Sequence, residues 1–217
     1  MTPLELDHLV FATPDLEATV AWFAEASGVV PTEGGRHVGL GTRNHLVGLG
    51  DGAYLEIVGP DPEQDEPTAP RPFGIDDLAQ ARLVTWAWRG GDLAARVAAA
   101  NDAGLDVGSV ISMQRATPDG ELLQWQLTVG APASLGPIQP VPFLIDWGDT
   151  PHPTATLDHP VGLDGIVVTA PDVSRVAADW AALSSIDETV PGLELLKSDL
   201  VKMVASLRTP AGRVILD

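Results

Sequence analysis

Three stretches of the chain share one pattern of apolar and polar positions. In each stretch a short apolar run leads into a turn, and an acidic residue then opens an amphipathic segment. The stretches span residues 7–16, 84–93 and 164–173. Aligning their acidic residues places His8, Thr85 and Gly165 at one equivalent position. A pattern that recurs at such spacing indicates that the chain contains copies of one folding unit.

Each of these runs is followed by apolar residues at helical spacing. In the first copy the helical face consists of Leu16, Val20 and Phe23. Thr13 precedes this helix as its expected N-cap, because a hydroxyl can accept from the free N–H groups of the first turn. The second helix is expected to end near Gly104, and the third near residues 184–185. One amphipathic helix of ordinary length is therefore predicted in every copy.

Three strand-like segments, separated by Gly, Pro, Asp or Asn, follow each predicted helix. They cover residues 36–40, 45–49 and 54–58 in the first copy, 108–114, 122–129 and 142–147 in the second, and 193–197, 202–208 and 213–217 in the third. The unit therefore reads βαβββ three times. A doubly wound nucleotide-binding fold is disfavoured, because no Gly-x-Gly-x-x-Gly follows a strand and strands greatly outnumber helices.

The repeat predicts an α+β fold of tandem βαβββ modules that form a cup-shaped mixed sheet, with a third βαβββ-like unit at the C-terminus. One helix cannot cover a four-stranded sheet on both faces, so two modules are expected to pair. The expected boundaries are a first module at 1–60, a linker at 61–79, a second module at 80–150, a linker at 151–161 and the third unit at 162–217.

Composition narrows the classes of function. The 217 residues carry a formal net charge of −18, which disfavours nucleic acid and anionic membranes as partners. The absence of cysteine excludes disulfides, thiolate catalysis and sulfur-ligated zinc. No apolar run approaches the length of a membrane span, and no signal peptide is recognisable, so a cytoplasmic location is expected.

Several motifs together resemble the vicinal-oxygen-chelate superfamily, and within it the glyoxalase-like domain proteins. The superfamily includes glyoxalase I, extradiol dioxygenases and bleomycin-binding proteins. The resemblance covers about residues 4–150. It is carried by Leu6-Asp7-His8-Leu9-Val10, His37 before Gly41-Thr42-Arg43-Asn44, Gly50-Asp51-Gly52-Ala53-Tyr54-Leu55-Glu56, Arg115 before Pro118-Asp119-Gly120, Trp125, and Pro142-Phe143-Leu144-Ile145-Asp146-Trp147.

The resemblance implies a divalent metal in the cup, bound by the first and last strands of each module. It assigns this role to His8 and Glu56 in the first module, with Fe, Mn, Ni, Zn or Co as suitable ions. The second module departs from the pattern, because Thr85 stands at one ligand position. Asp146 is left there as a third ligand or as a general base.

Further candidates would bind the substrate. His37 and Asn44 could line the cup, although Asn44 could also hold a turn. Arg115 could act in catalysis by meeting a substrate carboxylate, or could pair with a neighbouring acid. Four aromatic residues could form an apolar wall or ordinary core, namely Trp88, Trp125, Phe143 and Trp147. His152 and His159 are expected to be solvated loop residues.

Three hypotheses of function follow. The first is a metal-assisted lyase, isomerase or dioxygenase acting on a small oxygen-rich molecule. The second is a metal-free protein that binds or sequesters a small molecule, as Thr85 at a ligand position would allow. The third concerns assembly: the third unit has no module to pair with, so its free sheet edge predicts a homodimer formed through residues 160–217.

Overall fold

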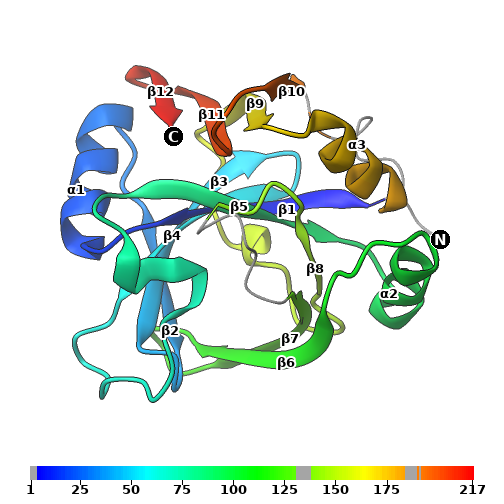
Figure 1. The fold of residues 1–217 in the computed structure, drawn as a ribbon. Coiled ribbons are helices and arrows are strands. Elements are labelled where there is room, and N and C mark those ends of the chain that lie inside the picture. The colour runs from blue at the N-terminus through cyan, green and yellow to red at the C-terminus, as the bar shows by residue number, and fades with distance from the viewer. Residues whose placement is uncertain (1–3, 131–137, 184–189, 191) are drawn as a thin grey trace.

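The computed structural model describes residues 4–130, 138–183, 190 and 192–217. Eight strands close into a barrel, and four C-terminal strands form a second sheet that lies across the outside of that barrel (Figure 1). The predicted α+β class and the curled mixed sheet are confirmed. Among the described residues, no helix is long and apolar enough to cross a membrane.

The barrel is built from the first two βαβββ units. The first unit contributes β1 (Glu5–Ala12), β2 (Thr32–His37), β3 (Thr42–Gly50) and β4 (Ala53–Pro60). The second contributes β5 (Arg82–Arg89), β6 (Ser109–Ala116), β7 (Leu122–Val129) and β8 (Phe143–Asp146). The strand order around the barrel is β1-β4-β3-β2-β6-β7-β8-β5, so each unit supplies one continuous half.

Two seams join the halves. On one side β1 runs antiparallel to β5 along nearly its whole length, and on the other β2 meets β6 at the single pair Arg36–Ala116. Within each half, the first strand lies parallel to the last, β1 beside β4 and β5 beside β8. The cup that the sequence predicted is therefore closed at both seams.

Helices α1 (Leu16–Ser27) and α2 (Leu93–Asp102) lie on the outside of the barrel (Figure 1). The N-cap of α1 is Asp15, whose carboxylate accepts from the backbone N–H of Ala18 at 3.0 Å. The expected cap, Thr13, lies two residues too early and instead contacts the hydroxyl of Thr19. Two short 3-10 helices, η1 (Pro72–Asp77) and η2 (Pro153–Ala155), occupy the linkers.

The third unit has the expected order of elements along the chain, but its strands pair in a different order from those of the two barrel halves. It consists of β9 (Gly162–Ala170), α3 (Val173–Ala182), β10 (Leu193–Lys197), β11 (Lys202–Thr209) and β12 (Gly212–Leu216). Its strands lie in the order β10-β9-β11-β12, so β9 pairs with β10 and β11 and not with the last strand. The expected end of the third helix at residues 184–185 lies outside the described residues, as do residues 131–137 of the second module.

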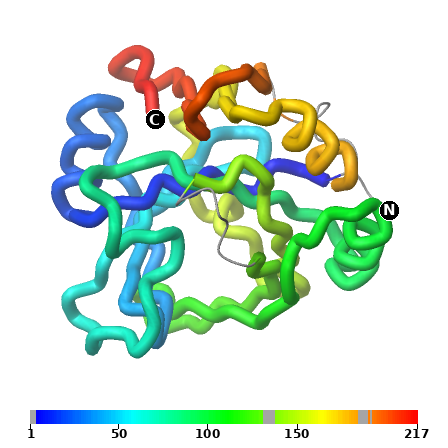
Figure 2. The backbone as a smooth tube through the Cα atoms, in the orientation of Figure 1, coloured from blue at the N-terminus to red at the C-terminus, as the bar shows by residue number. Residues whose placement is uncertain are grey.

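The C-terminal unit packs on the outside of the barrel, where β11 lies against β5 and β9 against β3 (Figure 2). Trp86 and Trp88 are fully buried in this interface, where the Trp180 ring of α3 meets Trp86 edge to face at 5.5 Å. The indole N–H groups of Trp86 and Trp180 both donate to the carbonyl of Pro140, at 3.1 and 3.0 Å. Barrel and C-terminal unit therefore share one hydrophobic core.

Candidate functional site

Four strands of the first module direct polar side chains into the barrel. Nε2 of His8 lies 3.7 Å from Glu56 Oε2, and Nε2 of His37 lies 3.7 Å from Glu56 Oε1. The amide of Asn44 donates to Glu56 Oε1 at 2.5 Å. All four side chains are buried. The structure therefore brings together His8, Glu56, His37 and Asn44, which the sequence had proposed separately.

A β-bulge places Asp7 beside His8. Leu6 pairs with Trp88 and His8 with Ala87, so Asp7 is an extra residue in the β1–β5 ladder. A bulge of this kind redirects a side chain that strict alternation would send to the opposite face. As a result, Asp7 Oδ1 lies 2.6 Å from His8 Nδ1. With Nδ1–H donating to this carboxylate, Nε2 of His8 carries the lone pair and is directed toward Glu56.

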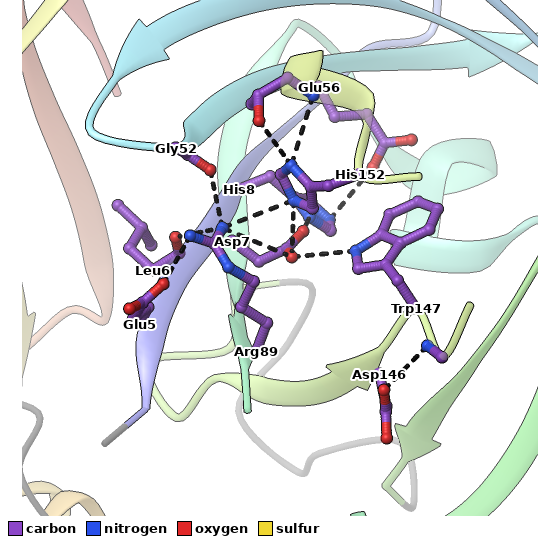
Figure 3. Close-up of polar contacts among 12 residues, drawn as sticks. Glu5, Leu6, Asp7, His8, Gly52, Glu56, Arg89, Asp146, Trp147 and His152 are labelled. Atoms are coloured by element: carbon purple, nitrogen blue, oxygen red, sulfur yellow. Dashed lines mark hydrogen bonds and ion pairs between the residues drawn. The ribbon is translucent and has the colours of Figure 1, made fainter. Parts of the chain in front are cut away.

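Asp7 is fully buried and has two further donors (Figure 3). The indole N–H of Trp147 donates to Oδ2 at 3.0 Å, and Nε2 of His152 also lies 3.0 Å from Oδ2. Burial alone would raise the pKa of Asp7. The hydrogen bonds from His152 and His8 outweigh burial and hold that pKa well below its usual range.

Arg115 enters the same interior from β6 of the second module. Its side chain is 4% exposed, and its Nη1 donates to Asn44 Oδ1 at 3.2 Å. Asn44 therefore links the guanidinium to the Glu56 carboxylate. Burial lowers the pKa of Arg115, since a charged group loses its hydration there. His37 behaves in the same way, because burial lowers its pKa against the opposing effect of Glu56.

Aromatic rings surround this polar cluster. The ring of Tyr54 stacks on His8 at 4.7 Å, and Phe143 meets His8 edge-on at 5.5 Å. The ring centroid of Trp125 lies 6.5 Å from that of His37 and 5.1 Å from that of Trp147. Three of the four aromatic residues proposed from the sequence therefore line or approach the cluster.

Two proposed site residues lie elsewhere. Trp88 points outward into the core shared with the C-terminal unit, with its ring 5.6 Å from Trp86. Asp146 is half-buried and accepts from the backbone N–H of Gly148 at 2.9 Å, away from the cluster (Figure 3). It borders a hollow of about 360 Å³ at the end of the barrel, which Arg89 and His152 also line. The structure does not bring Asp146 to His8 and Glu56.

The donor set is short of what a divalent ion needs. Within the described part of the chain, no group of three or more His, Cys, Asp or Glu side chains is arranged to hold a metal. Thr85 is buried on β5 at the position where a ligand from the second module was sought. The residues present therefore do not fit a metal centre with ligands from both modules.

Asp7 and His152 are functional candidates that the sequence did not reveal. Asp7 precedes His8 directly, so regular strand alternation would place it on the opposite face, and only the bulge in the β1–β5 pairing brings the two side chains together. His152 was interpreted as a solvated loop residue, but its side chain is only 20% exposed and contacts the Asp7 carboxylate. A histidine in a proline-rich linker carries no sequence signal of such a contact.

Two βαβββ modules that close around a shared polar interior define the vicinal-oxygen-chelate architecture that the motifs resemble. The sequence model of a family described as a glyoxalase-like domain matches residues 6–184. The chain therefore belongs to the glyoxalase-like domain family, which confirms the resemblance. No curated protein matches the sequence.

Solved structures resemble this fold at low sequence identity. A hypothetical protein from Staphylococcus aureus is 14% identical, with 99% of each chain covered and a TM-score of 0.67. Methylmalonyl-CoA epimerase from Mycobacterium tuberculosis is 17% identical over 65% of this chain and 85% of that one, with a TM-score of 0.40. A mutant 4-hydroxymandelate synthase from Streptomyces coelicolor is 16% identical over 99% and 63%, with a TM-score of 0.49. The staphylococcal protein shares the fold over the whole chain.

Proposed function

We propose that the barrel interior binds a small, oxygen-rich molecule and that His8 transfers a proton to or from it. The observation that supports this most directly is the 2.6 Å contact between Asp7 Oδ1 and His8 Nδ1. It orients the imidazole so that Nε2, which makes no hydrogen bond within the described residues, is available to a bound molecule. Buried acid–histidine pairs of this kind orient general bases in enzymes.

The chemistry that fits is proton abstraction from a carbon next to a carbonyl group. His8 Nε2 takes the proton, and the electron pair of the C–H bond moves onto the carbonyl oxygen to give an enolate. Donors in the interior, such as the guanidinium of Arg115, would stabilise that oxygen. Return of the proton to the same or to another carbon makes the protein an isomerase or epimerase.

Solvent exchange tests this without knowledge of the natural substrate. A panel of small 2-oxo and 2-hydroxy carbonyl compounds is incubated with the protein in D₂O, and deuterium at the adjacent carbon is measured by NMR. We expect exchange with at least one compound, and a loss of about 10²- to 10⁴-fold in its rate on His8→Gln, the range typical of a general base. His159→Gln, in the linker, is the matched control. If no compound exchanges, or if both variants exchange equally, the proton-transfer proposal is wrong.

The alternative is a non-catalytic binding protein, and the same experiment distinguishes it from an enzyme. Such a protein would bind members of the panel, detected by calorimetry, but would catalyse no exchange with any of them.

A metal-dependent lyase, isomerase or dioxygenase is the second candidate. Its ligands would have to come from the first module alone, where His8 Nε2 and His37 Nε2 each lie 3.7 Å from an oxygen of Glu56. Elemental analysis tests this candidate by measuring the metal content of protein purified from cells supplied with Fe, Mn, Ni, Zn and Co. Stoichiometric metal that is lost on Glu56→Gln would favour this candidate, and metal below a tenth of an equivalent would exclude it, by the criterion that a resident ion is retained.

A further inference from the structure

The buried arginine of the barrel lacks a direct counter-ion. None of the carboxylates in the described part of the chain lies within 4.0 Å of the Arg115 guanidinium, and the one hydrogen bond it makes there is to Asn44. A guanidinium offers five N–H donors. An arginine that is only 4% exposed and keeps most of these donors unused is costly for the folded state. A compensating group is therefore expected from outside the chain.

A second buried donor without a partner lies on the neighbouring strand. Nε1 of Trp125 is buried and makes no hydrogen bond among the described residues. In the β6–β7 register Arg115 pairs with Leu123, and Met113 pairs with Trp125. Arg115 and Trp125 are thus diagonal neighbours that share the inner face of the barrel. Diagonal positions of this kind are within reach of long and aromatic side chains.

We propose that the molecule bound in the barrel is a monocarboxylate with an apolar body, held at its carboxylate by Arg115 and by the indole N–H of Trp125. This deepens the proposed function, since it names the substrate class of the same site. Arginine matches a carboxylate with two parallel hydrogen bonds, which a neutral oxygen ligand cannot accept as well. The apolar side chains Met113, Leu123 and Phe143 pack around Trp125 and would contact the body of the molecule.

The charges of the interior favour a carboxylate over a phosphate. Glu56 is joined to Arg115 through Asn44, so an anion bound at Arg115 also experiences the repulsion of that carboxylate. In a medium of low dielectric, a second negative charge on the ligand would double this repulsion. A singly charged, planar group therefore fits where a dianion does not.

The experiment uses three probes, namely benzoate, its neutral isostere benzamide, and inorganic phosphate. Calorimetry measures their affinity for the intact protein, and the ¹H–¹⁵N signal of the Trp125 indole reports the new hydrogen bond. That signal is assigned by its disappearance in Trp125→Phe. We expect benzoate to bind about 10- to 100-fold more tightly than benzamide or phosphate, the range for a charge-assisted hydrogen bond. The Trp125 signal should move on addition of benzoate and not of benzamide.

Substitution of Arg115 separates binding from folding. Arg115→Met keeps a similar volume and removes the uncompensated charge, so its Tm should equal or exceed that of the parent while benzoate binding falls at least about tenfold. Arg213→Met removes an exposed arginine of β12 and should leave affinity unchanged. If Arg115→Met does not fold, Arg115→Lys serves, with an expected loss of about tenfold because a point charge replaces the fork.

Three results would overturn the proposal. They are no binding of benzoate by the parent protein, equal binding by the Arg115 and Arg213 variants, and phosphate binding as tight as that of benzoate. Benzoate has no exchangeable C–H next to its carboxylate, so its binding does not depend on catalysis. Failure of deuterium exchange with retained benzoate binding would therefore reject the proton-transfer proposal alone.

Discussion

At the scale of single residues, Asp7 determines how the site is organised. Its carboxylate accepts from the rings of His8 and His152 and from the indole of Trp147, so one buried anion joins the interior of the barrel to the loop that follows β8. A buried carboxylate with several N–H donors is stabilised only while all of them remain in place. Asp7 therefore couples the orientation of His8 to the position of the linker that contains η2.

Asp7→Asn should destabilise the protein and change its response to acid. An amide can no longer accept all three donors, so the free energy of unfolding at pH 7 should fall by about 2 to 4 kcal/mol. Because the folded-state pKa of Asp7 is depressed, its contribution is complete above about pH 4 and is lost as the pH falls through lower values.

Urea unfolding between pH 3 and pH 7 measures both effects. The parent protein should lose more stability below pH 4 than the Asn variant does. Asp179→Asn, at a partly buried carboxylate of α3 that pairs with one exposed arginine, is the control and should retain the parent's pH profile apart from its ion pair with Arg175. Parallel pH profiles for the parent and Asp7→Asn would show that the three contacts do not stabilise the carboxylate.

At the scale of elements, the sequence predicted all three helices and the approximate location of every strand except the second. The apolar periodicity of α1 and of β7 is local, so it can be read without knowledge of partners. The second strand was misplaced: Thr32–His37 forms β2, whereas residues 38–41 form a turn. The pattern was ambiguous there because β2 contains adjacent glycines and few apolar residues. The order of strands in the third unit could not be predicted from the sequence either, because the partner of each strand depends on long-range packing.

The candidate site divides in the same way. His8 and Glu56 could be found because a polar residue in an apolar strand is conspicuous in sequence. Asp7 required the bulge, and His152 required the path of a linker, and neither leaves a periodic signal. Asp146 was selected by its place in the last strand of the second module, but strand alternation there directs Phe143 and Ile145 inward and Asp146 away.

Gly34 in β2 leaves space for the side chain of Arg115. A Cβ built on Gly34 would collide with Asn44 Oδ1 and with Arg115 Nη1. Gly34→Ala should therefore displace the Arg115–Asn44 contact and weaken benzoate binding by about tenfold or more, through loss of a charge-assisted bond. Gly39→Ala is a control of affinity, because a Cβ there meets no atom within 4 Å, although its positive φ adds strain. Calorimetry on both variants decides the matter, and unchanged affinity of Gly34→Ala would contradict the role of this contact.

At the scale of the whole molecule, the C-terminal unit completes the fold by covering the outer face of β5 and β3. This arrangement places the same two strands between the polar interior and the shared core. It also changes the surface of the protein. Residues 162–217 contain five basic and eight acidic residues, a net charge of −3 against −18 for the whole chain. Repulsion between two copies is therefore weakest where their C-terminal units approach each other.

The outer edge of β10 is where we expect two copies to pair into a homodimer. No strand in the described part of the chain pairs with that edge, whereas α1 lies against β12 at the other end of the sheet. Leu196 is 48% exposed on β10, and an apolar residue on an open edge favours association with a second strand. An antiparallel contact between two β10 edges would be isologous, as a two-fold dimer requires.

Sedimentation equilibrium at micromolar concentration should give twice the chain mass, and Leu196→Lys should shift the protein to a monomer by placing like charges across the two-fold axis. Leu122→Lys, an equally exposed leucine on β7 of the barrel, should leave the dimer intact. A monomeric parent would reject the dimer, and a Leu196→Lys dimer would move the interface away from β10. In either case the barrel site, which both modules of one chain complete, would be unaffected.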